Sequence, residues 1–116
     1  MAKTLAHYIG GQFTGASDAL ESTNPSDTNE IVARFPDGGE DEVNAAVAAA
    51  SEAQEKWAAA SPEVRADLLE KVAVALFARS AEIGELLARE EGKTRAEGIG
   101  ETLRAARIFR YFGAEA

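Results

Sequence analysis

Alanine supplies 25 of the 53 apolar side chains in this 116-residue sequence, and this share limits the core that the chain can build. Leucine, isoleucine, valine and phenylalanine together number only 24 of the 116 residues. This fraction is close to the level of roughly 20% below which a chain of high net charge tends to be disordered. Alanine favours helices but buries little surface. We therefore expect good helices around a thin core, in a chain that completes its packing against something else.

Charge and residue types exclude several classes of function. The formal net charge is −8, and an acidic chain repels polyphosphate, so nucleic acid is not an expected partner. The absence of cysteine excludes a disulfide framework and a thiolate nucleophile. Apolar runs such as Ala45–Ala50 are too short to cross a membrane, and no apolar signal segment opens the sequence. We expect a cytoplasmic protein that contacts no membrane.

Two β-hairpins are predicted over residues 7–35, and the first has a glycine pair at its turn. The segments His7–Ile9 and Gln12–Thr14 flank Gly10-Gly11. Both central residues of a type I′ turn need a positive φ, which glycine adopts without steric cost. These residues therefore predict a tight two-residue hairpin.

The second predicted hairpin joins residues 19–23 to residues 30–35 through a polar loop. The loop, Asn24–Asn29, contains Pro25, whose ring presets its own φ. Its asparagine and aspartate side chains favour turns because they can bind nearby backbone N–H groups. An isolated hairpin is marginal in water, so both hairpins need further packing.

After residue 40 the apolar spacing becomes helical and predicts three helices, at about residues 40–59, 62–91 and 95–112. Gly84 weakens the second helix, while Gly98 and Gly100 in the third permit either a close neighbouring backbone or a kink. The predicted apolar faces are Val43, Val47, Ala50, Ala53 and Trp57 in the first helix, Leu68, Leu69, Val72, Leu76, Ile83 and Leu87 in the second, and Ile99, Leu103, Ala106, Phe109 and Phe112 in the third.

The predicted helix ends carry capping signals. Ser61 is a good N-cap with Pro62 at the first helical position, and Gly92 suits the residue after a helix end. Thr94 and Glu97 match the capping box, in which each side chain satisfies the other residue's backbone N–H.

No self-contained active site is predicted, and we assign no catalytic and no cofactor-binding residue. His7 is the single imidazole and has no partner at useful spacing. The segment Gly92-Lys93-Thr94 resembles the end of a phosphate-binding loop, but Leu87 occupies the position where that loop needs glycine. The segment Gly98-Ile99-Gly100 follows no strand, so it does not predict a dinucleotide site either.

The order of these segments resembles the N-terminal part of the NAD(P)-dependent aldehyde dehydrogenase superfamily, over nearly the whole chain. The matching segments are Tyr8–Phe13, Thr23–Pro36, Lys56-Trp57, Ser61–Leu69, Glu90–Thr94 and Phe109–Ala114. The polar loop and the closing Phe-Arg-Tyr-Phe are similar to the branch that oxidises α-ketoglutarate semialdehyde.

The resemblance implies an α+β fragment, with two N-terminal β-hairpins followed by three α-helices, in the nucleotide-binding half of a larger α/β fold. Residues 1–116 would form the N-terminal part, with the cofactor and catalytic regions absent. In that family a cysteine thiolate attacks the aldehyde, hydride passes to NAD or NADP, and water releases the acid. The implied partners are the remainder of the enzyme chain and further copies in a dimer or tetramer. This chain alone is then expected to bind no cofactor and to be inactive.

The resemblance also implies a monovalent cation site in some members, formed by a main-chain oxygen and a carboxylate. By position, Thr23 and Glu101 would correspond. The alternative role for Glu101 is a capping or surface residue on the third helix.

A different class of function stays open at this point. The sequence also fits a small acidic helical module, without catalysis, that binds a protein partner through its aromatic third helix. A cysteine-containing continuation of the reading frame favours the enzyme, whereas a self-sufficient monomer favours the module.

Overall fold

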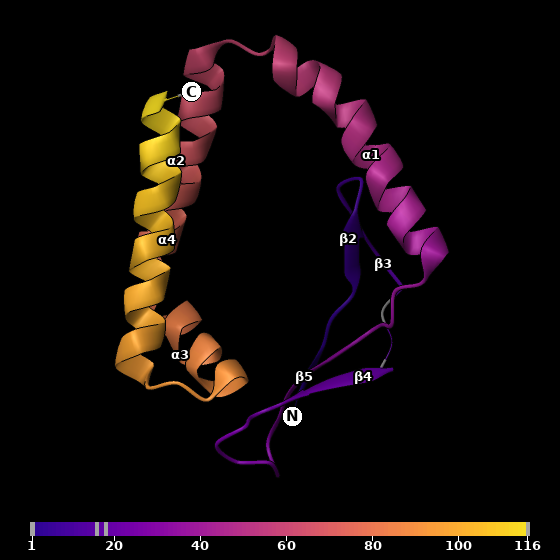
Figure 1. The fold of residues 1–116 in the computed structure, drawn as a ribbon, viewed down its shortest axis with the longest axis vertical. Coiled ribbons are helices and arrows are strands. Elements are labelled where there is room, and N and C mark those ends of the chain that lie inside the picture. Colours follow the sequence, from indigo (N-terminus) through magenta and orange to yellow (C-terminus); the bar gives the residue numbers. More distant parts are fainter. Residues whose placement is uncertain (1, 16, 18, 116) are drawn as a thin grey trace. The chain divides into compact units, whose positions relative to one another are not determined.

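The computed structural model describes residues 2–15, 17 and 19–115 (Figure 1). The chain divides into two compact units, Met1–Ala59 and Ala60–Ala116, and each is described by itself. The first unit contains all the described strands and one helix, and the second contains three helices.

The first hairpin of the first unit consists of β2 (His7–Ile9) and β3 (Gln12–Thr14), paired antiparallel. Gly10 and Gly11 join them with φ values of 58° and 79°, as the predicted turn requires. This pair coincides with the first hairpin predicted from the sequence. Its two strands are short, and the pair forms a sheet separate from the other strands.

The second sheet has the order β1-β5-β4. The antiparallel pair β4 (Leu20–Thr23) and β5 (Ile31–Phe35) coincides with the second predicted hairpin, and β1 (Lys3–Thr4) adds a parallel partner to β5 that was not predicted. Val32 on the central strand is buried. This small sheet therefore holds the core of the first unit.

The loop between β4 and β5 is organised by a buried asparagine. Asn24 donates from Nδ2 to Oε2 of Glu30 over 2.7 Å, and its Oδ1 accepts from the backbone N–H of Ser26 at 2.9 Å. The backbone N–H of Asn24 also donates to the carbonyl of Glu30. These bonds close the seven-residue connection between the strands, residues 24–30, and so hold the ends of β4 and β5 together.

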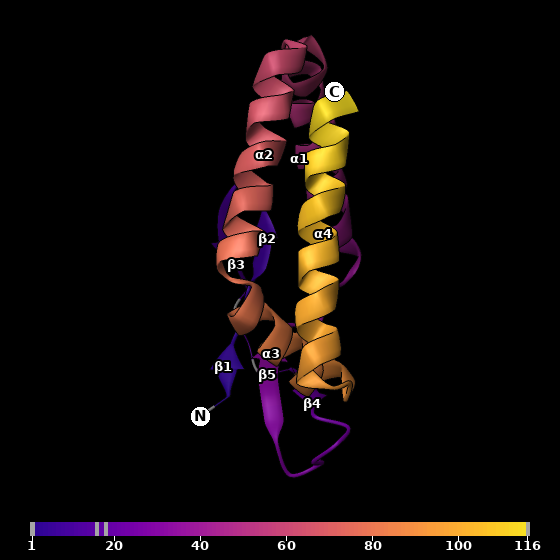
Figure 2. The same cartoon turned by 90° about the vertical axis from the view of Figure 1, so that its left-hand side faces the viewer.

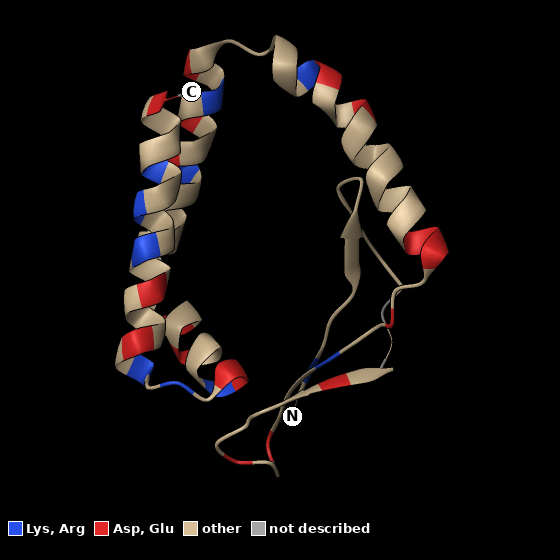
Figure 3. Cartoon of the chain, viewed as in Figure 1, with Lys and Arg blue, Asp and Glu red and all other residues tan. Residues whose placement is uncertain are grey.

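Helix α1 (Glu40–Ala59) begins with three acidic residues. The carboxylate of Glu42 accepts a hydrogen bond of 2.8 Å from the backbone N–H of Gly39, and this bond lowers the pKa of Glu42. No residue of α1 is buried, and Val43 and Val47 of the predicted apolar face are 58% and 60% exposed. Figure 3 shows that the middle of α1 carries no charge, so this exposed face is apolar.

The second unit contains three described helices in place of the two that were predicted there. The predicted helix over residues 62–91 is instead two helices, α2 (Pro62–Ala78) and α3 (Ser80–Glu91), separated at Arg79 with φ −105° and ψ 13°. The whole chain therefore has four described helices rather than three. The break turns α3 onto α4 (Arg95–Glu115), which lies along α2 (Figures 1 and 2).

The crossing of α3 and α4 depends on Gly84 and Gly98. A Cβ atom at Gly84 would lie 2.5 Å from the backbone nitrogen of Ile99, and one at Gly98 would overlap the carbonyl oxygen of Gly84. Both glycines are buried, as is Thr102, whose hydroxyl donates to the carbonyl of Gly98 over 3.0 Å. Of the two roles predicted for Gly98, close backbone approach is therefore the one observed.

The capping signals act as predicted. The hydroxyl of Ser61 accepts from the backbone N–H of Val64 at 3.4 Å, and Gly92 ends α3 in the left-handed conformation with φ 77°. Thr94 and Glu97 form both halves of the capping box, at 3.0 Å and 3.3 Å, and the Thr94 bonds lower the pKa of Glu97. Local signals thus set these helix ends.

Helix α4 runs three residues farther than predicted, to Glu115. Gly113 near its end is buried, and a Cβ atom there would lie 3.4 Å from the carbonyl oxygen of Ala66 on α2. The extension follows from this contact, which keeps the last turn of α4 on α2.

The core is thin, as the alanine content predicts. Among the described residues the buried apolar side chains are those of Val32, Ala73 and Ala106, and no large side chain is fully buried. Leu68 and Phe112 were predicted on buried faces, but they are 49% and 58% exposed. No described helix is long and apolar enough to cross a bilayer.

Candidate functional site

The two residues predicted to hold a monovalent cation lie on exposed elements. Thr23 ends β4 next to an irregularity in the pairing with β5, and Glu101 lies in the second turn of α4. Thr23 belongs to the first unit and Glu101 to the second. The Thr23–Glu101 cation site therefore stays a prediction.

Glu101 has a charged partner that the sequence analysis did not foresee. The Lys93 ammonium lies 2.7 Å from Oε2 of Glu101 and 2.6 Å from Oε2 of Glu91, and the Lys93 side chain is 17% exposed. The hydrogen bonds to Glu101 and Glu91 raise the pKa of Lys93, which therefore stays charged. We call these three residues the Lys93 cluster.

The Lys93 cluster spans the connection between α3 and α4. Glu91 is the last residue of α3, Lys93 lies in the loop after Gly92, and Glu101 lies on α4. A cation at this place also meets the negative end of the α3 dipole. The spacing of acidic and basic residues over 91–101 was the only sequence signal that could have indicated the cluster.

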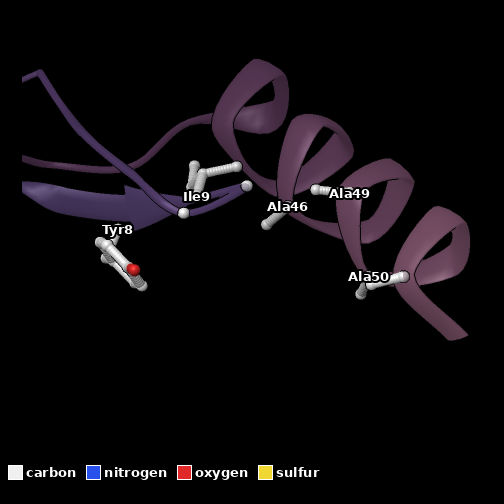
Figure 4. Close-up of a pocket in the computed structure, with 8 residues that line it drawn as sticks. Tyr8, Ile9, Ala46, Ala49 and Ala50 are labelled. Atoms are coloured by element: carbon white, nitrogen blue, oxygen red, sulfur yellow. The ribbon is translucent and has the colours of Figure 1, made fainter. Parts of the chain in front are cut away.

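A shallow apolar hollow of about 380 Å³ lies in the first unit, between the β2–β3 turn and α1 (Figure 4). The turn contributes Tyr8, Ile9, Gly10 and Gly11, and the helix contributes Ala46, Ala49, Ala50 and Ala53. The phenol of Tyr8 is the one titratable group among these lining residues. Such a lining suits apolar packing and, apart from the Tyr8 phenol, offers no side chain for acid–base or nucleophilic chemistry.

Two glycine-containing segments of this chain, Gly10-Gly11 and Gly98, do not have the setting of a dinucleotide-binding loop. Gly10 and Gly11 form a hairpin turn, and Gly98 faces the backbone of Gly84 inside the α3–α4 crossing. A phosphate-binding loop needs free backbone N–H groups between a strand and a helix. In the part of the chain that the structure describes, no group of three or more His, Cys, Asp or Glu residues could hold a metal ion.

Comparisons with known proteins agree on one family. The family model described as "Aldehyde dehydrogenase family" matches residues 13–116. The chain is 43% identical over 90 residues to a 2-aminomuconic semialdehyde dehydrogenase of Danio rerio, covering 78% of the chain and 18% of that protein. It is 35% identical to an alpha-ketoglutarate semialdehyde dehydrogenase of Haloferax volcanii, covering 100% of the chain and 24% of that protein.

The fold agrees with the sequence comparison. A crystal structure of lactaldehyde dehydrogenase from Escherichia coli superposes with a TM-score of 0.92 at 30% identity, over 98% of this chain and 24% of that one. The chain spans less than a quarter of the length of each of these three proteins. The matched family model covers most of the sequence, and the chain belongs to the aldehyde dehydrogenase family.

Proposed function

We propose that this chain is the N-terminal segment of a longer aldehyde dehydrogenase and has no activity by itself. The observation that carries the proposal is a family match over residues 13–116 in a chain that spans under a quarter of its relatives. The exposed apolar face of α1 supports it, because such a face needs a covering surface. Family membership favours this reading over the small interaction module.

The parent enzyme oxidises an aldehyde to a carboxylic acid: a hydride passes to the oxidised form of NAD or NADP, one water supplies the second oxygen of the acid, and one proton is released. The nucleophile is a cysteine thiolate that forms a thiohemiacetal and then a thioester. This chain contains no cysteine, so that residue belongs to the remainder of the polypeptide. Because Gly10-Gly11 forms a hairpin turn and Gly98 packs against Gly84, we assign this segment a structural role within the nucleotide-binding half rather than cofactor contacts.

The substrate class that we propose is a semialdehyde, an aldehyde with a carboxylate at its far end. The support is that the relatives at 43% and 35% identity are both named as semialdehyde dehydrogenases. An enzyme that binds the far carboxylate with a buried positive group can distinguish such substrates from plain aldehydes. A plain aldehyde would leave that positive group without a partner, so its transition state would bind less tightly. A semialdehyde should therefore have a higher kcat/KM than a plain aldehyde of equal chain length.

The test compares the 116-residue chain with the polypeptide encoded by the complete reading frame. Each is mixed with NAD or NADP and an aldehyde, and the formation of reduced nicotinamide is followed by absorbance. We expect turnover from the complete polypeptide and none from the 116-residue chain. Turnover by the short chain would contradict the proposal, as would inactivity of the complete polypeptide with every aldehyde class.

We also propose that the parent enzyme forms a homo-oligomer, a dimer or a tetramer. Exposed apolar side chains on α4, including Phe109 and Phe112, support an additional contact surface beyond the segment itself. Light scattering on the complete polypeptide tests this, and a monomeric mass across a concentration series would reject it.

A further inference from the structure

The Glu101 carboxylate already has a cation within the chain. Lys93 Nζ lies 2.7 Å from Oε2 of Glu101 and 2.6 Å from Oε2 of Glu91, and the lysine side chain is mostly withdrawn from solvent. An ammonium has three donors, and this one directs two of them to carboxylates. Lysine is a compact, strongly hydrated point charge, similar in this respect to a monovalent metal ion.

The charges of the cluster explain why a cation is needed there. Glu91 and Glu101 reach one point from the two helices that the loop joins. Without a positive charge between them their carboxylates would repel each other, and the end of the α3 dipole would add to the negative potential. The cluster therefore requires one positive charge.

We propose that the Lys93 ammonium is the resident monovalent cation of Glu91 and Glu101, in place of a metal ion at Glu101. A metal ion on the Glu101 carboxylate would be repelled by the Lys93 ammonium that already lies 2.7 Å from its Oε2, which argues against the Thr23–Glu101 site as a metal site. This proposal rests on the proposed function in one respect: the sample is the complete polypeptide. The test measures stability and cation binding rather than turnover, so its failure can be distinguished from a failure of the proposed function.

The experiment measures the melting temperature of the complete polypeptide in sodium chloride and in choline chloride at equal ionic strength. Choline is too large to replace a metal ion between two carboxylates. The quantity of interest is the sodium-minus-choline shift in Tm, compared between the wild type and Lys93→Met. We expect Lys93→Met to lower the Tm by several degrees in choline and to recover part of this loss in sodium. The sodium-minus-choline shift in Tm of the wild type should be at most half of the shift of Lys93→Met.

Three controls separate the cluster from general charge effects. Lys71→Met removes an exposed lysine of α2 in the same unit, so it should leave the wild-type shift unchanged. Lys93→Arg keeps the positive charge, so its sodium-minus-choline shift in Tm should be close to that of the wild type. The double variant Lys93→Met/Glu101→Gln removes one carboxylate and should lose the gained response.

Crystals soaked in thallium(I) give a direct readout, because thallium scatters anomalously and replaces potassium. We expect an anomalous peak beside Glu101 in Lys93→Met and none in the wild type. A thallium peak at Glu101 in the wild type overturns the proposal. An equal sodium-minus-choline shift in the wild type and Lys93→Met overturns it as well. Should Lys93→Met fail to fold, the wild-type thallium crystal still decides.

Discussion

Arg110 on α4 and Glu70 on α2 form a two-pronged ion pair across the helix interface. Nε of Arg110 donates to Oε2 of Glu70 over 3.0 Å, and Nη2 donates to Oε1 over 2.7 Å. The guanidinium carbon also lies 5.0 Å from the centroid of the Phe77 ring. The planar fork of arginine matches both oxygens of a carboxylate, which fixes how the two helices align.

Replacing Arg110 by lysine should therefore destabilise the α2–α4 pair although the charge is kept. Lysine cannot reproduce the fork or the stacking over Phe77. We expect Arg110→Lys to lower the Tm of the complete polypeptide, and Arg110→Met to lower it further. The neighbouring exposed Arg107→Lys is the matched control and should change the Tm little. An Arg110→Lys variant as stable as the wild type would show that the geometry adds nothing beyond charge.

The same pair predicts a dependence of stability on pH. The hydrogen bond from Arg110 lowers the pKa of Glu70 below its ordinary value of 4.5. A carboxyl with a lowered pKa stabilises the folded state above its unfolded pKa, and this contribution disappears as the pH falls through the folded pKa. The Tm difference between the wild type and Glu70→Gln should therefore be full at neutral pH and shrink below about pH 4.5. A difference that stays constant down to pH 3 would disagree with this assignment.

The α3–α4 crossing should tolerate no side chain at Gly84 or Gly98. A Cβ atom at Gly84 would lie 2.5 Å from the Ile99 backbone nitrogen, and backbone cannot move aside as a flexible side chain can. We expect Gly84→Ala and Gly98→Ala each to cost about 1–3 kcal/mol of unfolding free energy or more.

Gly100 provides the control for this prediction, because it lies on α4 like Gly98 and a Cβ atom there would meet nothing within 4 Å. Gly100→Ala should raise stability by up to about 1 kcal/mol, since alanine is the better helix former. Chemical denaturation with a shared slope measures all three variants. If Gly84→Ala behaves like Gly100→Ala, the close crossing is not present in solution.

Features with a local cause were predictable from the sequence. The Gly10-Gly11 turn, the Ser61 N-cap and the Thr94–Glu97 capping box each depend on residues within four positions of one another. Alanine content likewise predicted the thin core, because composition limits the area that any arrangement can bury.

Features with a tertiary cause were not predictable. Arg79 is neither glycine nor proline, and the helix breaks there because α3 turns to bring Gly84 against Gly98. Strand β1 is two residues long, too short for a periodic signal, and its partner strand lies thirty residues away. In the Lys93 cluster the contact to Glu101 crosses a loop and a helix start, so spacing alone did not indicate it.

The capping box at the start of α4 should contribute measurably to stability. Thr94 accepts from the Glu97 backbone N–H, and Glu97 accepts from the backbone N–H and the hydroxyl of Thr94. Thr94→Ala removes the hydroxyl and should cost about 1 kcal/mol, whereas Thr94→Ser keeps it and should be nearly neutral. Thermal melting compares the two. Equal losses for alanine and serine would point to the threonine methyl group instead of the cap.

The exposed apolar face of α1 gives a test of whether the remainder of the enzyme covers it. Val47 is 60% exposed and Ala45, two residues earlier, lies on the opposite side of the helix. Aspartate at an exposed position changes stability by about 0.5 kcal/mol or less, whereas a buried unpaired carboxylate costs several times more. If the proposed parent enzyme buries this face, Val47→Asp should lower the Tm of the complete polypeptide far more than Ala45→Asp does. The two variants carry the same charge in the same helix, and the loss of helix propensity is the larger for Ala45→Asp, so a greater loss of Tm in Val47→Asp reports coverage of this face. Equal and small changes in both would mean that the face stays in water, and the thin core would then need another explanation.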